Sequence, residues 1–163
     1  MPCFKVLRLA LNEFQYHYRH TIMGAEFETK RKIEFSETDM AGIVHFSNFF
    51  RWMETVENQF LESVGLPVVK QDGDIFYGWP RRKASFDFKV PVRYGDTVRL
   101  KLTVKEIRIR SVRYAVTVRL DTPEAPLCAR GEMTTVWTRI NPNNGQIESV
   151  PFPDGMVEKF EGA

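Results

Sequence analysis

The feature that most constrains the fold is a change in hydrophobic period near residue 46. Apolar and charged side chains alternate over residues 27–35, which is typical of a half-buried strand. From Phe46 to Val64, apolar side chains instead recur every three or four positions. That spacing predicts one helix whose apolar face is broad enough to be mostly buried.

Local signals mark both ends of this helix. Ser47 or Asn48 is expected to cap its start, because short polar side chains accept hydrogen bonds from free backbone N–H groups. Gly65, followed by Pro67, is expected to end it. Residues 68–80 are expected to form a loop.

Strands account for most of the remaining chain. Alternating apolar positions predict strands over residues 84–90, 98–109, 112–120 and 127–140. A slip in the alternation at Lys105–Glu106 predicts a bulge. The predicted fold class is α+β, with one long buried helix wrapped by a curved antiparallel sheet of five to six strands. Exposed sheet edges are usually paired or covered, so a homodimer or homotetramer is expected.

Composition narrows the classes of function. The chain has 23 basic and 21 acidic side chains, a balance that argues against nucleic-acid binding. No apolar run approaches the roughly 18 residues of a membrane span, so no membrane partner is expected. Cys3 and Cys128 lie far apart and form no C-x-x-C pair, which favours a reducing, cytoplasmic setting over a disulfide framework.

A single domain is expected over residues 23–163. Residues 1–22 are interpreted as an N-terminal extension or a mis-assigned start, because the segment that begins at Met23 has the pattern of a clean domain start. His17 and His20 lie in the extension without an acidic or thiol companion, which is weak evidence for a metal. No metal or other cofactor is therefore expected.

Three segments, in order along the chain, resemble one protein family. They are FSETDMAGIVHFSNFFRWMETVENQFLESVGLP (residues 35–67), GWPRRKASFDFKVPVRYGD and KEIRIRSV. They resemble the signature of the 4-hydroxybenzoyl-CoA thioesterase family of hotdog proteins. The resemblance implies a hotdog fold and hydrolysis of an acyl-CoA thioester. It also implies that Asp39 is the catalytic carboxylate and that the backbone N–H of Phe46 polarises the thioester carbonyl.

The residues themselves suit this chemistry. Thioester hydrolysis needs a nucleophile or general base and donors for the oxyanion, and a helix N-terminus supplies free N–H groups. Asp39 lies shortly before the predicted helix, and Gly42 permits a tight backbone path between them. Asp39 could attack carbon directly or activate water, and the sequence leaves both routes open. An aspartate shortly before a glycine is also a common turn residue, which is the alternative role.

Two other side chains are weaker catalytic candidates. His45 could act as an acid or base, but some family relatives carry histidine one position later, where this chain has Phe46. Packing within the loop is the alternative role for His45. Glu54 could face the acyl group, whereas Glu57 is expected to face solvent.

A basic cluster is the candidate site for coenzyme A. Arg108, Arg110, Ser111 and Arg113 crowd one predicted turn, and guanidinium groups suit phosphate. The resemblance implies that these residues meet the nucleotide part of CoA, and a solvated hairpin end is the alternative. Residues 81–83 form a second basic cluster.

The expected acyl pocket combines side chains of the helix with side chains of the segment that follows it: Phe49, Phe50, Met53, Tyr77 and Trp79. The sequence does not identify the acyl group. The predicted function is hydrolysis of an acyl-CoA thioester to a free carboxylic acid and CoA. The alternatives are a non-enzymatic acyl-CoA binding or assembly protein of the same fold, and a hotdog dehydratase.

Overall fold

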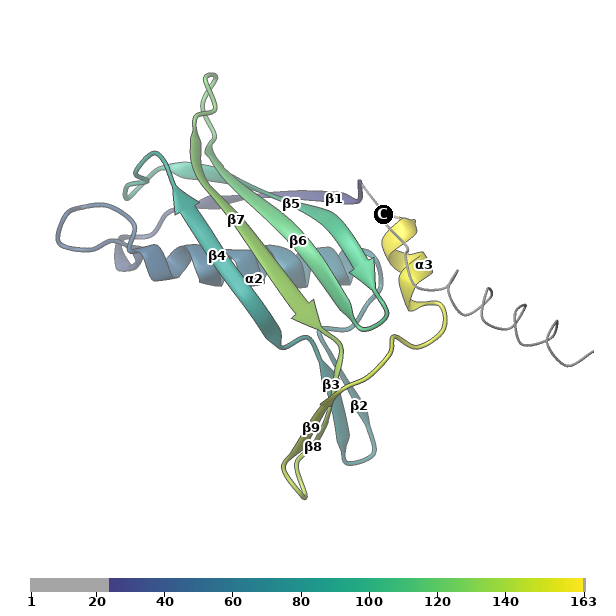
Figure 1. Cartoon of the computed structure of the whole chain (residues 1–163). Coiled ribbons are helices and arrows are strands. Elements are labelled where there is room, and N and C mark those ends of the chain that lie inside the picture. Colours follow the sequence, from purple (N-terminus) through teal and green to yellow (C-terminus); the bar gives the residue numbers. More distant parts are fainter. Residues whose placement is uncertain (1–23, 163) are drawn as a thin grey trace, which may run out of the picture.

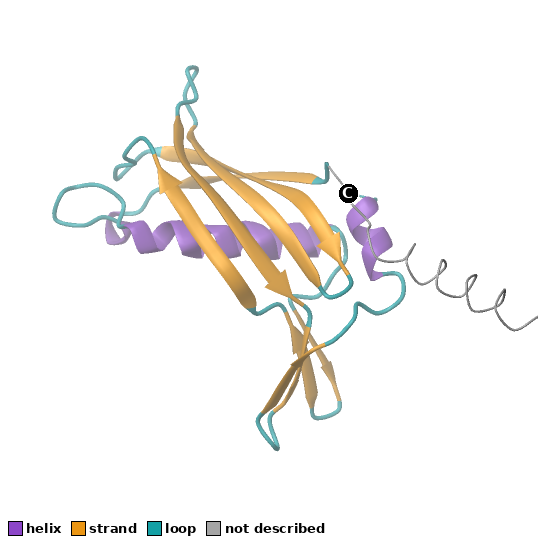
Figure 2. Ribbon diagram, in the orientation of Figure 1, coloured by secondary structure: helices purple, strands orange, loops and turns teal. Residues whose placement is uncertain are grey.

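A five-stranded antiparallel sheet wraps around one long helix (Figures 1 and 2). The computed structural model describes residues 24–162. Across the sheet, the strands follow the order β1 (Glu26–Lys32), β5 (Thr97–Arg108), β6 (Ser111–Leu120), β7 (Leu127–Val136) and β4 (Arg81–Phe88). The α+β class and the strand number agree with the sequence prediction.

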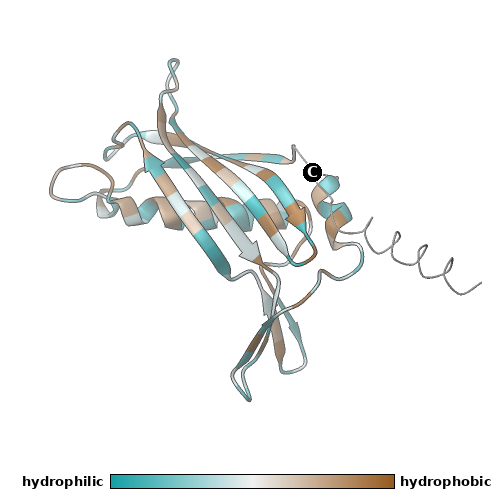
Figure 3. Ribbon diagram, in the orientation of Figure 1, coloured by the Kyte–Doolittle hydropathy of each residue, from teal (hydrophilic) through white to brown (hydrophobic). Residues whose placement is uncertain are grey.

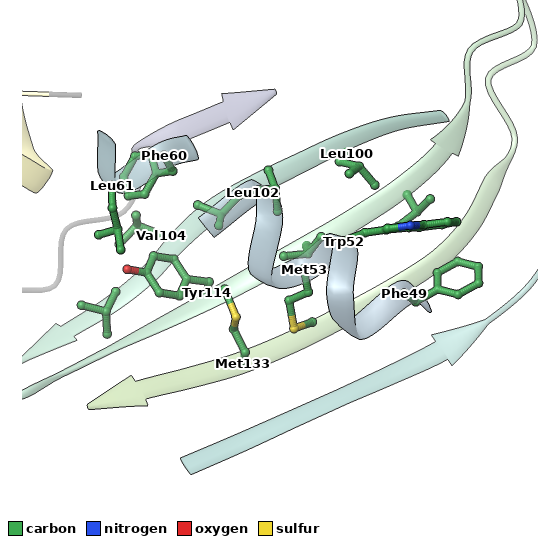
Figure 4. Close-up of a cluster of buried hydrophobic side chains, with 14 of the residues drawn as sticks. Phe49, Trp52, Met53, Phe60, Leu61, Leu100, Leu102, Val104, Tyr114 and Met133 are labelled. Carbon is green, nitrogen blue, oxygen red and sulfur yellow. The ribbon is translucent and has the colours of Figure 1, made fainter. Parts of the chain in front are cut away.

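The helix α2 (Phe46–Ser63) covers one face of this sheet, and its apolar stripe forms the core (Figure 3). Figure 4 shows side chains from the helix meeting side chains from the strands: Phe49, Trp52, Met53, Phe60 and Leu61 against Leu100, Leu102, Val104, Tyr114 and Met133. Gly131 of β7 lies where the side chains of Met53 on α2 and Phe86 on β4 come closest to the backbone of β7. A Cβ there would lie 2.6 Å from Met53 Cε and from Phe86 Cε1, so the missing side chain lets the helix and β4 pack tightly on β7.

The helix starts and ends where its apolar spacing predicts, and Gly65 follows it in the left-handed conformation, with φ +68°. The predicted caps, Ser47 and Asn48, were wrong. His45 is the N-cap, and its ring Nδ1 accepts from the Ser47 backbone N–H. An unprotonated imidazole nitrogen supplies the acceptor that serine or asparagine supplies in commoner caps.

The first strand is shorter than predicted. β1 ends at Lys32, and the chain then turns into the short 3₁₀ helix η1 (Phe35–Glu37). Phe35 is 74% exposed and lies edge-on to Tyr94, at 5.8 Å between ring centroids, so it does not enter the core. The turn forms because the Glu37 carboxylate accepts the backbone N–H of Glu34.

Four short strands form a second sheet, which projects from the lower end of the molecule in Figure 1. They are β2 (Val69–Asp72), β3 (Ile75–Gly78), β8 (Thr138–Asn141) and β9 (Gln146–Ser149). The prediction of a loop over residues 68–80 was therefore wrong. All four residues of β2 are exposed, so no apolar alternation marks the strand. A short helix, α3 (Met156–Glu161), closes the chain and buries Phe160 against Trp79.

The bulge predicted in the second long strand is confirmed, because the pairing of β5 with β6 shifts register between Val104 and Glu106. The expectations for residues 1–22, including His17 and His20, lie outside the described residues. Within residues 24–162, no helix has both the length and the apolar character needed to cross a bilayer.

Candidate active site

A buried carboxylate, Glu37, anchors the loop that precedes α2. Glu37 is 7% exposed and accepts hydrogen bonds from the Trp52 indole N–H at 2.8 Å, the Arg31 guanidinium and the Glu34 backbone N–H at 2.9 Å. Burial alone would raise the pKa of Glu37, but these hydrogen bonds outweigh it and hold the pKa below the ordinary glutamate value. The carboxylate therefore ties β1, η1 and α2 together.

The loop of residues 38–44 is fixed at its base. Thr38 and Val44 form an antiparallel bridge, and the Val44 N–H donates to the Val92 carbonyl at 2.8 Å. The His45 N–H donates to the Glu37 carbonyl at 2.9 Å. In Figure 1 this loop extends beyond the first turn of α2. Its base is thus held by its own bridge and by backbone hydrogen bonds to Val92 and Glu37, while its tip reaches solvent.

Asp39 lies at the second position of this loop and is exposed. Its Oδ1 accepts the Ala41 backbone N–H at 2.8 Å, and its own N–H donates to the Ile43 carbonyl at 2.9 Å. Gly42 adopts φ +71°, as its predicted role requires, and donates to the Asp39 carbonyl at 2.9 Å. Asp39 is therefore a turn residue, and the turn holds its carboxylate in solvent, in the loop that leads into α2.

The hydrogen bonds that cap the first turn of α2 join His45 to Ser47 and Asn48 and do not involve Phe46. The His45 ring accepts the Ser47 N–H at 3.4 Å, and the His45 carbonyl accepts the Asn48 N–H at 3.0 Å. The cap therefore does not use the Phe46 N–H. The Asn48 side chain donates to the Glu37 carbonyl at 2.8 Å. His45 is thus engaged as a cap, with Nδ1 also 2.8 Å from Ser47 Oγ.

The two glutamates of the helix are placed differently from the prediction. Glu54 is exposed and lies 3.5 Å from an Arg81 nitrogen. Glu57 does not face solvent: its side chain is 1% exposed and accepts from Arg81 at 2.5 Å. Glu57 falls four positions after Met53 and four before Leu61, on the buried stripe, so helical spacing could have located it.

The predicted basic residues largely converge. A pocket of about 550 Å³ lies on the sheet face opposite the helix and is lined by Arg82, Lys83, Glu106, Arg108, Ser111, Arg113 and Thr134. Both basic clusters seen in the sequence thus contribute to one pocket. Arg110 is not part of the lining and instead donates to the Ser149 carbonyl and hydroxyl at 3.3 and 3.2 Å. Glu106 accepts from Arg108 at 2.8 Å and lies 3.5 Å from Arg113.

The predicted acyl-pocket residues fall into two separate groups. Phe49 and Met53 are buried beneath α2, and Phe50 lies 5.3 Å from the ring of Phe86. The second group packs around Trp137: Tyr77 stacks on it at 5.7 Å and Trp79 lies 4.7 Å away. Tyr77 and Trp137 line a pocket of about 270 Å³ whose lining includes none of the first group.

The packing of aromatic side chains of β4 with Phe49 and Phe50 was not predicted from the sequence. Phe88 lies 5.0 Å from Phe49, and Phe86 lies 5.7 Å from the same ring. The sequence pattern could have located them, since Phe86 and Phe88 are two of the alternating apolar positions that predict this strand. We call Phe49, Phe50, Phe86 and Phe88 the aromatic cluster.

Within one chain, Asp39 and the basic pocket lie at opposite ends of the sheet. The Asp39 loop contacts Val92 just before β5 begins, whereas the pocket is built where β5 ends, at Arg108. Twelve strand residues separate these ends, which corresponds to about 35 Å of extended chain. A single chain does not bring the candidate carboxylate and the basic pocket together.

The long helix wrapped by an antiparallel sheet, with a closed loop before the helix, defines a hotdog-fold protein. The solved structure of 4-hydroxybenzoyl-CoA thioesterase from Pseudomonas sp. strain CBS-3 superimposes with a TM-score of 0.71, at 22% identity, over 83% of this chain and 99% of that chain. The chain belongs to the thioesterase-like superfamily, whose family model matches residues 33–160.

Curated relatives are similar over all or part of their length. The 4-hydroxybenzoyl-CoA thioesterase of Pseudomonas sp. (strain CBS-3) is 26% identical over 143 residues, which cover 83% of this chain and 98% of that protein. The 1,4-dihydroxy-2-naphthoyl-CoA hydrolase of Synechococcus sp. (strain CC9605) is 31% identical over 84 residues, 46% of this chain and 54% of that protein. A relative from Aquifex aeolicus (strain VF5) is matched over 62% of its length, at 36% identity over 50% of this chain.

Proposed function

We propose that this protein hydrolyses an acyl-CoA thioester to a carboxylic acid and CoA, with Asp39 as the catalytic carboxylate. The observation that carries the proposal is the exposed Asp39 carboxylate, held by a closed loop next to a helix start whose cap leaves the Phe46 N–H unused. Two of the three relatives, from Pseudomonas and Synechococcus, are named as CoA thioester hydrolases, which supports it. A structural neighbour was solved with its 4-hydroxybenzoyl-CoA ligand as an aspartate-to-asparagine mutant, which also fits a catalytic aspartate.

Two routes balance chemically. In the first, Asp39 attacks the thioester carbon, the C–S bond breaks, CoA leaves as a thiol after protonation, and water hydrolyses the mixed anhydride. In the second, Asp39 takes a proton from water, whose oxygen attacks the same carbon; the C–S bond then breaks, and the CoA sulfur leaves as a thiol after it receives that proton. In both routes, the Phe46 N–H and the positive end of the α2 dipole stabilise the oxyanion.

We propose that the site is completed by a second copy of the chain paired along β4. β4 is an edge strand with the short side chains Ala84 and Ser85 at its centre, whereas β1, the other edge, carries alternating charges. Its Phe88 end lies beside the first turns of α2, and its Arg81 end adjoins the basic pocket. Antiparallel pairing of two β4 strands would therefore bring Asp39 of one copy towards the pocket of the other.

This arrangement predicts a dimer, or a tetramer built from dimers. Sedimentation velocity at micromolar protein should show a species of at least twice the mass of the chain. Proline in place of Ser85, at the centre of the edge strand, should shift that species towards the monomer and lower the specific activity in parallel. A parent protein that is monomeric yet fully active would contradict the shared site.

The lining of the basic pocket predicts that alanine substitutions of Arg108 and Arg110 have different effects on KM. Arg108→Ala removes one of the pocket's four cationic side chains, so KM for acyl-CoA should rise about three- to tenfold with kcat nearly unchanged. Arg110→Ala is the matched control, because its side chain binds Ser149 outside the pocket. The KM difference should shrink at high salt. Equal KM values for both variants would place the nucleotide elsewhere.

An aromatic acyl group suits the aromatic cluster and is the acyl group that both relatives' names specify. A thiol-release screen over benzoyl-, naphthoyl- and straight-chain acyl-CoAs tests the proposal directly. Turnover of at least one aromatic thioester is the expected result. Binding of every acyl-CoA without release of thiol would instead favour a non-enzymatic acyl-CoA binding protein.

We also propose a cytoplasmic setting. The thiol of Cys128 is free and buried in the core, and burial raises its pKa, which keeps it unreactive. Reduced thiols of this kind are the norm in the cytosol. Fractionation of cells that express the full chain would check the location.

A further inference from the structure

The buried side of β4 carries an ion pair that none of the chemistry above uses. The Glu57 carboxylate lies between α2 and the sheet, and Arg81 reaches it from the first residue of β4. The side chain of Glu57 is 1% exposed and that of Arg81 is 30% exposed. Glu57 Oε1 and the hydroxyls of Thr135 and Tyr114 form no hydrogen bond of standard geometry among the described residues. The Thr135 hydroxyl nevertheless lies close enough to the other two groups to lower the pKa of each. A buried, incompletely satisfied carboxylate is costly, so its retention calls for an explanation.

The register of β4 explains what the ion pair holds in place. Arg81 pairs with Thr135, but Lys83 pairs with Thr134, so Arg82 is an extra residue in the strand. Arg82 and Lys83 therefore oppose the single residue Thr134, as in a β-bulge. Both line the basic pocket on the outer face together with Thr134, whereas Arg81 points inward to Glu57.

We propose that Glu57 is a positioning residue for the basic pocket: by holding the Arg81 side chain against α2, it fixes the bulge that presents Arg82 and Lys83 side by side to the nucleotide phosphates. This inference rests on the proposed function, because it assumes that the pocket binds CoA. It adds to that function a contact on the opposite face of the sheet that sets the affinity for the nucleotide.

The ion pair also makes that affinity depend on pH. Burial raises the pKa of Glu57 to about 7, and the Arg81 guanidinium opposes the rise. The other groups that face it are Glu54 on its own helix, Tyr114 on β6 and the neutral Thr135 on β7. Burial raises the pKa of Tyr114 well above its ordinary value, so that hydroxyl stays neutral. Glu57 is therefore the group in this cluster that titrates near neutrality, and its protonation weakens the hold on Arg81.

The test measures binding of CoA itself by isothermal titration calorimetry, with the full-length chain. Glu57→Gln should weaken CoA binding about three- to tenfold at pH 8.5, and the ratio of the two Kd values should approach one at pH 6, where Glu57 of the parent is mostly protonated. Glu62→Gln, the same change at an exposed position of the same helix, should leave Kd unchanged at both pH values. Because the variant and the parent bind the same ligand, titration of the CoA phosphate cancels in the ratio.

Four results would overturn the inference. Tighter CoA binding by Glu57→Gln would mean that the negative charge of Glu57 merely repels phosphate. Weaker binding by the same factor at pH 6 and pH 8.5 would mean general loosening of the fold. Equal Kd values would remove Glu57 from the pocket while the proposed function stands, whereas a parent that fails to bind CoA would remove both.

A second variant keeps the test valid if Glu57→Gln folds poorly. Arg81→Gln should weaken CoA binding by the same factor at pH 8.5, because it releases the same bulge. Where Glu57→Gln folds, the double variant should bind no more weakly than either single variant. Additive losses would show that the two residues act separately and would contradict the inference.

Discussion

Asp39→Asn should lower kcat by about a hundredfold or more, while KM for acyl-CoA changes little. The amide removes the charge, the nucleophilicity and the basicity of the side chain. Its oxygen can still accept the Ala41 N–H that closes the turn, so the loop and the fold should be retained. Thiol release at saturating acyl-CoA measures the loss, and thermal unfolding checks the fold.

The matched control for this change is Asp154→Asn, an exposed aspartate in the segment before α3. It should hydrolyse acyl-CoA at the parental rate. A folded Asp39→Asn protein with near-parental turnover would remove Asp39 from catalysis. His45 and Glu54 would then be the next candidates, although His45 serves as a helix cap and Glu54 is paired with Arg81.

The second large effect is expected on stability. Glu37→Ala should lower the free energy of unfolding by about 3 kcal/mol, because it leaves the Arg31 guanidinium, the Trp52 indole and the Glu34 N–H without their acceptor. Urea denaturation followed by circular dichroism measures the loss. Glu28→Ala, an exposed position on β1, is the control and should change stability by less than about 0.5 kcal/mol.

The same carboxylate predicts a direction for acid unfolding. The folded state lowers the pKa of Glu37, so the unfolded chain binds the proton more tightly. The stability that Glu37 contributes is therefore complete above the ordinary glutamate pKa and is lost as pH falls through the lower folded-state value. Glu37→Gln keeps an acceptor oxygen but cannot titrate, so its stability should fall less steeply in acid than that of the parent. Parallel curves would refute this assignment.

The elements that could be predicted from sequence are those whose signal is local. The helix followed from its 3.6-residue spacing, and the bulge in β5 followed from one slip in alternation. The hairpin of β2 and β3 could not be predicted in this way, because β2 is exposed throughout and is held by backbone pairing to its neighbour. Backbone hydrogen bonds are the same for every residue type and leave little trace in the sequence.

In the candidate site too, local motifs could be predicted from the sequence, whereas contacts between distant residues could not. Asp39 and Gly42 were predicted from a contiguous motif; the positive φ of Gly42 is confirmed, and the catalytic role of Asp39 stays a prediction. The environment of Glu57 depends on Arg81, 24 positions away on another strand. The surroundings of Tyr77 and Trp79 could not be predicted for a related reason, since both follow the helix closely in sequence but pack around Trp137, about 60 positions further on.

The separation of Asp39 from the basic pocket has a genetic consequence. In a dimer of the proposed kind, each site takes its carboxylate from one chain and its pocket from the other. A chain defective only in Asp39 and a chain defective only in the pocket would then form mixed dimers with one doubly damaged site and one intact site. Two loss-of-function alleles of this gene should therefore complement each other when their lesions lie at opposite ends of β5, and fail to do so when both lie at the same end.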